Sequence, residues 1–239
     1  MRTNTGIEGL DMMLNGGLPR GRIVLVSGST GTGKTTLGMQ FIYNGVKQFN
    51  EPGVYMTFEQ DKEKIKADMS LLGMNLDELG DKFRLVGGPI ATVYKYKKKT
   101  KAGVEDIIGE VEEIVREIDA KRVVLDPINL FLMLFDSEDE RRMALATLSE
   151  HLTALGCTSL LVCEVKEQSI DISRYGFEEF VVDGVIALYS INQGQSFLQG
   201  VTVRKMRGIK HHREIRPYEI TDSGIAVYPT QPWLPGGEE

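Results

Sequence analysis

The stretch Gly28-Ser29-Thr30-Gly31-Thr32-Gly33-Lys34-Thr35 matches the pattern G-x-x-x-x-G-K-[ST] at every fixed position. An apolar run precedes it at residues 22–27, and a helical pattern follows it at residues 35–48. Glycines let the backbone wrap its N–H groups around phosphates, and the N-terminus of the next helix favours an anion. We therefore predict a phosphate-binding loop between a strand and a helix. The alternative is a glycine-rich turn that matches by chance.

The last residues of this loop predict how a nucleotide and its metal would be held. Lys34 would reach the β- and γ-phosphates, and the Thr35 hydroxyl would ligate Mg²⁺. Residues 28–35 and the adjoining Thr36 form the predicted nucleotide-binding set. A second strand should supply an acidic residue for the water shell of the metal, and Asp126 follows directly after an apolar run. Thr35 and Asp126 are therefore the predicted metal-site residues.

Hydrolysis also needs a group that orients or deprotonates the attacking water. Glu59 ends another apolar strand pattern, one strand–helix unit after the phosphate loop. We predict Glu59 for this role. The alternative is a solvated Glu59 that caps the next helix, with Asp61 and Glu63 in the first turn.

The order of patterns along the chain predicts the fold class. Short β-branched runs alternate with amphipathic segments from residue 22 to residue 163, which is typical of βα units wound into a mostly parallel sheet. After about Tyr175 the pattern changes to strands separated by turn signals. These strands are expected at residues 181–189, 197–205, 213–220 and 225–228. We predict an α/β fold in which they form an antiparallel extension of the same sheet.

Length and composition restrict the class of protein. The chain has 239 residues, of which 41% are hydrophobic and 26% charged, with a formal net charge of -6. These values exclude a disordered chain and argue against a protein that coats nucleic acid by bulk charge. No apolar run approaches the roughly 20 residues that span a bilayer, and the first residues form no apolar signal region, so we expect a cytoplasmic protein. Without a repeat or linker, we expect one domain at residues 1–229 and a Pro- and Gly-rich tail at residues 230–239.

Cysteine, histidine and tryptophan add little chemistry. Cys157 and Cys163 would lie roughly 20 Å apart along one buried strand, which is too far for a disulfide. With only three histidines, no His/Cys spacing typical of a metal site exists. Trp233 in the tail either docks on a neighbouring surface or covers its own domain.

Several further motifs resemble the KaiC branch of the RecA-like ATPases. They are Thr5-Gly6-Ile7-Glu8-Gly9-Leu10-Asp11, Gly16-Gly17-Leu18-Pro19, Arg174-Tyr175-Gly176-Phe177-Glu178-Glu179-Phe180-Val181 and Lys205-Met206-Arg207-Gly208. The resemblance runs from about residue 5 to residue 229. It implies a RecA-like, three-layer P-loop NTPase fold and an ATPase that assembles as a ring, usually a hexamer, with ATP bound between neighbours.

The resemblance also bears on catalysis within one subunit. Glu59 matches the first carboxylate of the family's catalytic Glu-Glu pair, whereas the second position is Gln60, which can orient water but cannot act as a base. Gln60 therefore motivates a further hypothesis, a nucleotide-binding module with negligible turnover. The two-domain clock protein of the family carries a phosphorylated Ser-Thr pair where approximate alignment places Glu179-Phe180 here. No phosphorylation switch is expected.

Three further residues match family positions that reach across to the nucleotide of the next subunit: Lys205, Arg207 and His211. A cation that approaches the γ-phosphate from outside stabilises transition-state charge and can be worth about 10³–10⁵ in rate. Without a neighbour, these side chains are expected to point at water. The alternative for Lys205 and Arg207 is an edge strand that carries charges against aggregation.

A RecA- or RadA-like DNA-binding ATPase is the competing function, because this core also serves recombination and repair. The segments that would contact DNA, residues 135–142 and 166–174, carry acidic residues, and the second has no aromatic side chain for base stacking. Residues 94–101 hold five lysines and two tyrosines, which suits either single-strand binding or a solvated loop. The sequence names no protein partner.

Overall fold

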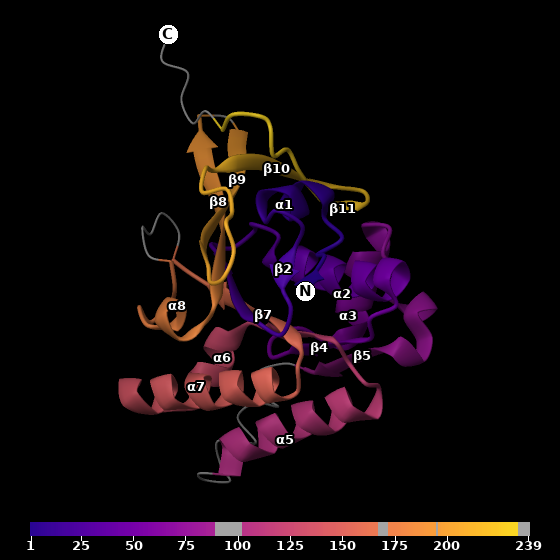
Figure 1. The fold of residues 1–239 in the computed structure, drawn as a ribbon, viewed down its shortest axis with the longest axis vertical. Coiled ribbons are helices and arrows are strands. Elements are labelled where there is room, and N and C mark those ends of the chain that lie inside the picture. The colour runs from indigo at the N-terminus through magenta and orange to yellow at the C-terminus, as the bar shows by residue number, and fades with distance from the viewer. Residues whose placement is uncertain (89–101, 167–171, 195, 234–239) are drawn as a thin grey trace.

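The computed structural model describes residues 1–88, 102–166, 172–194 and 196–233 (Figure 1). Nine strands of this described part form one sheet in the order β11-β10-β9-β8-β3-β7-β6-β4-β5. The strands are β3 (Ile23–Gly28), β4 (Gly53–Thr57), β5 (Phe83–Gly87), β6 (Arg122–Asp126), β7 (Thr158–Glu164), β8 (Gly184–Gln193), β9 (Ser196–Met206), β10 (Arg216–Thr221) and β11 (Gly224–Val227). A separate antiparallel pair joins β1 (Arg2–Thr3) to β2 (Leu18–Pro19).

The direction of the strands confirms a mostly parallel sheet with an antiparallel C-terminal extension. Strands β5, β4, β6, β7, β3 and β8 run parallel to one another, whereas β9, β10 and β11 each run antiparallel to the strand before them. One detail of the prediction was wrong, because β8 belongs to the parallel part. The chain leaves β7 beside the end of β3, crosses to the other end of the sheet and enters β8 beside the start of β3, so the reversal comes only after the turn at Gly194.

Helices cover both faces of the sheet and complete three layers (Figure 1). One face packs against α1 (Glu8–Met13), α2 (Lys34–Phe49), α3 (Lys62–Leu71) and the 3-10 helix η1 (Leu76–Lys82). The other packs against α5 (Ala102–Glu117), α6 (Ile128–Leu132), α7 (Glu138–Ala154) and α8 (Glu178–Val181). Helix α2 matches the helical pattern expected at residues 35–48, and α3, α5 and α7 fall among the amphipathic segments expected between residues 22 and 163. The short helices α1, α6, α8 and η1 are additions to that pattern.

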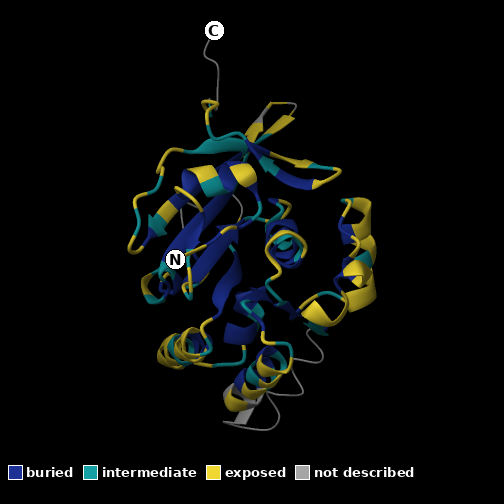
Figure 2. Cartoon of the chain, turned by 45° about the vertical axis from the view of Figure 1, so that its right-hand side comes forward, coloured by how far each residue is buried: buried dark blue, intermediate teal, exposed yellow. Residues whose placement is uncertain are grey.

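Burial of both sheet faces explains the continuous apolar runs in the sequence. Successive residues of a strand alternate between two cores: Tyr55 and Val124 belong to the core under α2, and Met56 and Leu125 to the core under α7. Figure 2 shows the central strands buried and the outer helix surfaces exposed. No helix of the described residues is long and apolar enough to cross a membrane.

The prediction that both cysteines are buried is confirmed, and the structure shows where Trp233 packs. Cys157 and Cys163 are buried free thiols, and burial raises their pKa values to about 11 and about 12. Trp233 packs on the Tyr189 ring, 6.2 Å between centroids, and lies over Gly200. It therefore covers its own domain. Residues 234–239 of the tail lie outside the described part.

Candidate nucleotide site at the carboxyl ends of the strands

The predicted phosphate loop connects the end of β3 to the start of α2. Gly31 and Gly33 both have a φ of 77°, a left-handed conformation that glycine adopts at little cost. Gly33 is the N-cap of α2, and no side chain of a described residue caps this helix end. The first N–H groups of a 16-residue helix are therefore free to bind an anion.

The shape of the loop is held from within and from a distant strand. The Thr32 hydroxyl donates to the Ser29 carbonyl at 2.8 Å, and Lys34 Nζ donates to the same carbonyl at 2.7 Å. Tyr218 of β10 donates its hydroxyl to the Thr32 carbonyl at 2.6 Å. Sequence reasoning missed Tyr218, because a lone tyrosine in a strand pattern gives no signal of such a contact.

Thr35 and Asp126 are brought together as the sequence predicted. Thr35 begins α2, Asp126 ends β6, and the Thr35 hydroxyl donates to Asp126 Oδ2 at 2.7 Å. Burial raises the pKa of Asp126, and hydrogen bonds from Tyr55 and Thr35 oppose this rise. Within the described residues, no group of three or more His, Cys, Asp or Glu could hold a metal. A hydroxyl and one carboxylate suit Mg²⁺, which takes its other oxygens from phosphate and water.

Glu59 lies at the same edge of the sheet, just after β4. Asp61, not Glu59, is the N-cap of α3 and accepts hydrogen bonds from the backbone of its first turn. The Thr57 hydroxyl accepts the backbone N–H groups of Glu59 and Gln60 and so orients both residues. Burial raises the pKa of Glu59, and repulsion from nearby carboxylates raises it further. Glu59 is exposed, and its pKa responds to Glu164, Asp126 and Lys34, so its carboxylate can contact a water molecule that attacks at this site.

A third carboxylate at this edge escaped the sequence analysis. Glu164 ends β7 and accepts a hydrogen bond from Thr30 of the phosphate loop at 2.6 Å. Asn129 binds both backbone groups of Glu164 and fixes the strand end. Burial lowers the pKa of Lys34, and attraction to Glu164 opposes this shift. The signal was available, since an apolar run that ends in a carboxylate is the same pattern that indicated Glu59 and Asp126.

The predicted cations of β9 lie at the opposite edge of the sheet. The Arg207 N–H binds the Asp183 carbonyl, and the Asp183 N–H binds the carbonyl of Ile23, the first residue of β3. The phosphate loop begins at Gly28, the last residue of β3. Because this strand has six residues and each adds about 3.3 Å, roughly 17 Å separate the two edges. Arg207 and Lys205 are therefore kept away from the phosphate loop of their own chain.

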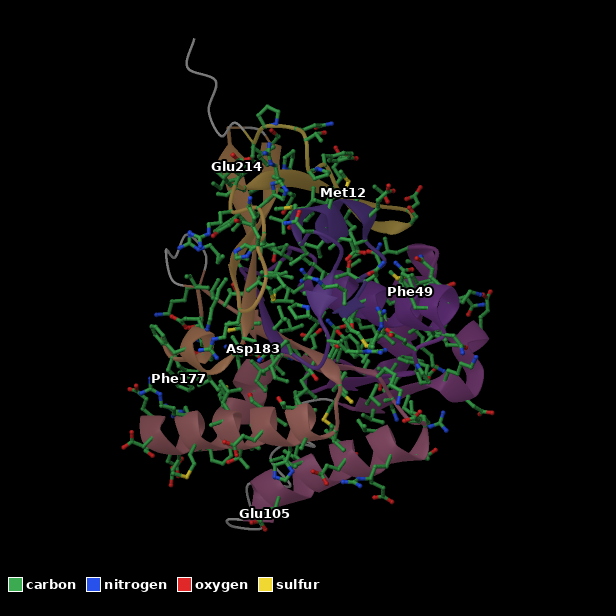
Figure 3. The ribbon with its side chains drawn as sticks, viewed as in Figure 1. Met12, Phe49, Glu105, Phe177, Asp183 and Glu214 are labelled. Carbon is green, nitrogen blue, oxygen red and sulfur yellow. The ribbon has the colours of Figure 1, made fainter. Side chains whose placement is uncertain are left out.

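The expectation that these cations point at water was wrong for Lys205. Its Nζ donates to the carbonyls of Glu179 at 2.8 Å and Val182 at 2.7 Å, at the end of α8, where helical carbonyls lack partners. Burial lowers the pKa of Lys205. The Arg207 guanidinium lies 3.6 Å from the carboxylate of Asp183, which is labelled in Figure 3.

The pairing of β9 bears on the edge-strand alternative for Lys205 and Arg207. Strand β10 pairs with β9 at Val201 and Gly200, and the β9 segment that carries Lys205 lies beyond this pairing, so the edge-strand alternative for its charge stays open. His211 is half-buried, and its Nε2 is enclosed without a hydrogen-bond partner among the described residues. Residues 94–101 and most of the 166–174 segment lie outside the described part.

A family model described as "ATPase: KaiC" matches residues 3–232. The chain belongs to the KaiC family of ATPases. A UPF0273 protein of Thermotoga maritima is 38% identical over 99% of this chain and 98% of its own length. The KaiC circadian clock oscillator protein of Parathermosynechococcus lividus is 34% identical over 95% of this chain, which spans only 42% of that protein.

A solved KaiC-like structure confirms the RecA-like fold. The crystal structure of a KaiC-like protein from the archaeon Pyrococcus horikoshii superposes with a TM-score of 0.84 at 34% identity. The match covers 96% of this chain and 99% of that one. This chain is thus an ATPase of the KaiC family, close in length to the Pyrococcus and Thermotoga proteins.

Proposed function

We propose that this chain is a Mg²⁺-dependent ATPase that works as a homohexameric ring, with each ATP held between two neighbours. The observation that carries the proposal is the separation of the two edges of the sheet. One edge presents a phosphate loop with Thr35 and Asp126 in contact, and the other presents Lys205 and Arg207. In a ring, the second edge of one subunit can face the first edge of the next.

Within one subunit, the loop from Gly28 to Thr36 binds the phosphates through its backbone N–H groups and Lys34. Thr35 and Asp126 would hold Mg²⁺, which when bound would supply positive charge beside the transferred phosphoryl group. Glu59 then orients the attacking water and accepts its proton. Gln60, held beside Glu59 by the Thr57 hydroxyl, contributes a hydrogen bond but no base.

Across the interface, Lys205 and Arg207 of one subunit bind the γ-phosphate of the ATP on its neighbour, and His211 contacts the same nucleotide. Lys205 must then exchange two backbone carbonyls for phosphate oxygens. That exchange suits a lysine, which is a flexible point charge with three rotatable donors. It also makes hydrolysis depend on assembly, since an isolated subunit keeps Lys205 on its own helix α8.

The output of the ATPase is proposed to be signalling or regulation through a protein partner. Two arginines at the segment expected to contact DNA are already occupied: Arg141 lies over the Tyr175 ring at 5.0 Å and Arg142 over the Phe177 ring at 5.9 Å. Residues 136–140 next to them carry four acidic side chains, three of them in the first turn of α7. These charges do not favour a DNA backbone.

The first test is steady-state ATP hydrolysis by the purified chain, with Mg²⁺ or EDTA and with or without single-stranded DNA. We expect slow, Mg²⁺-dependent turnover that DNA leaves unchanged, from a particle whose mass by light scattering is that of a ring. Stimulation by DNA would favour the recombinase-like function and direct attention to residues 94–101. Tight nucleotide binding with no turnover in assembled rings would favour the pure binding module. The single domain at residues 1–229, the tail and the cytoplasmic location stay predictions.

A further inference from the structure

Tyr55 is a fully buried side chain whose hydroxyl reaches Asp126 of the candidate metal site. It lies on β4 with 0% exposure and belongs to the core between the sheet and α2. Helix α2 carries Gly38 above it, where a Cβ would come within 3.0 Å of Val124 and 3.4 Å of the Tyr55 ring. The glycine lets the helix pass close to the sheet, and the tyrosine ring fills the space beside it.

The register of the sheet places the hydroxyl of this ring next to Asp126. In the parallel pair of β4 and β6, Tyr55 lies opposite Val124 and Thr57 lies opposite Asp126. Tyr55 and Asp126 are thus diagonal neighbours on the same face, a separation that a long aromatic side chain can bridge. The Tyr55 hydroxyl donates a hydrogen bond to Asp126 Oδ2.

The two oxygens of Asp126 consequently have different surroundings. Both hydrogen bonds that the carboxylate accepts from described residues, those of Tyr55 and Thr35, fall on Oδ2. No hydrogen bond from the described part of the chain reaches Oδ1, which leaves its lone pairs for another donor. Because a metal-bound water is such a donor, this arrangement turns one carboxylate oxygen into an anchor and the other into the acceptor for the water shell of Mg²⁺.

We propose that Tyr55 is a positioning residue for the metal: its hydroxyl fixes Asp126 through Oδ2 so that Oδ1 faces the water shell of Mg²⁺. The inference rests on the proposed function, since it concerns the Mg²⁺ of the same site. Tyr55 itself touches neither nucleotide nor metal. Its contribution is the orientation of a carboxylate that would otherwise be fixed by Thr35 alone.

The test uses Tyr55→Phe in the full chain, which removes one oxygen and keeps the ring in the core. The probe is a fluorescent, non-hydrolysable ATP analogue, whose affinity is measured in EDTA and during a Mg²⁺ titration. Tyr228→Phe is the matched control, because it removes another tyrosine-to-carboxylate hydrogen bond, to Glu219 at 2.9 Å, on the exposed surface. Circular dichroism melting shows whether each variant is folded.

We expect Tyr55→Phe to raise the Mg²⁺ concentration for half-saturation about tenfold while affinity in EDTA changes by less than about twofold. Tyr228→Phe should match the wild type in both. An unchanged Mg²⁺ requirement, or an equal loss of affinity in EDTA, would overturn the inference. If Tyr55→Phe does not fold, Tyr55→Met supplies a smaller, flexible apolar side chain without the hydroxyl and is read by the same criteria. A wild type whose nucleotide binding ignores Mg²⁺ would overturn the proposed function itself, and this inference with it.

Discussion

The two edges of the sheet differ in what one chain can complete. At the carboxyl ends of the strands, the phosphate loop, Thr35 and Asp126 already contact one another and need only a ligand. At the opposite edge, Lys205 and Arg207 are bound to carbonyls and a carboxylate of their own subunit. Under the proposed function, the difference means that one subunit can bind the nucleotide by itself, whereas Lys205 and Arg207 act on the nucleotide of a neighbouring subunit.

Removal of Lys205 should have the largest effect on turnover. We expect Lys205→Ala to lower turnover about 10³-fold, because the transition state loses a cation supplied from outside. Nucleotide affinity should change little, since the binding edge is intact. Turnover and affinity of the assembled protein are measured together, with Lys121→Ala, a half-buried lysine before β6, as the control. A Lys205→Ala enzyme with normal turnover would show that the second edge has no catalytic role.

Loss of the base at the binding edge should come next. Glu59→Gln is expected to reduce turnover by about 10²-fold and to leave nucleotide affinity intact, because a general base contributes at least this much. Single-turnover hydrolysis separates chemistry from binding. Glu63→Gln, in the first turn of α3, serves as the matched control and should hydrolyse at the wild-type rate. Unchanged hydrolysis in Glu59→Gln would remove Glu59 from the mechanism.

A smaller effect is expected on affinity when the loop loses its cation. Lys34→Ala should weaken nucleotide binding about 10- to 100-fold, the range for hydrogen bonds to a charged group. Lys47→Ala, in the last turn of the same helix, removes an equal charge and should bind normally. Equilibrium binding of a fluorescent nucleotide measures both variants. Equal losses in the two would mean that general charge, rather than the loop, holds the phosphates.

The smallest predicted effect is on pH dependence. The pKa of Glu59 is raised by burial and by repulsion from Glu164 and Asp126. A base must be deprotonated to act, so as pH is lowered kcat/KM should begin to fall at a higher pH than it would with an ordinary carboxylate. Glu164→Gln removes one repulsive charge and keeps an acceptor for Thr30. Its acid limb should therefore move to lower pH. A limb that stays in place, or moves upward, would show that Glu59 is not the titrating base.

Much of this arrangement could be predicted from the sequence. The exceptions all depend on how separate segments of the chain pack together, which local patterns do not record. Residues 28–35 specify their own loop because glycine positions and the following helix are local features, and Asp126 follows from a strand pattern. Lys205 could not be placed, because backbone carbonyls of α8 have no sequence signature. The direction of β8 was missed because a strand has the same pattern in either orientation. Tyr55 looked like ordinary core, and only the register of β4 and β6 sets it beside Asp126.

The central claim, that each site takes its two halves from different subunits, is tested most directly by mixing two variants with complementary defects, at a nucleotide concentration where each alone hydrolyses little ATP. Lys34→Ala subunits lack the phosphate cation, and Lys205→Ala subunits lack the cation for their neighbour. In rings mixed at random in equal amounts, about one quarter of the interfaces combine an intact loop with an intact Lys205. We predict that ATPase activity returns to roughly that fraction of the wild-type rate. Mixed rings that are confirmed to form and yet hydrolyse no ATP would contradict the account.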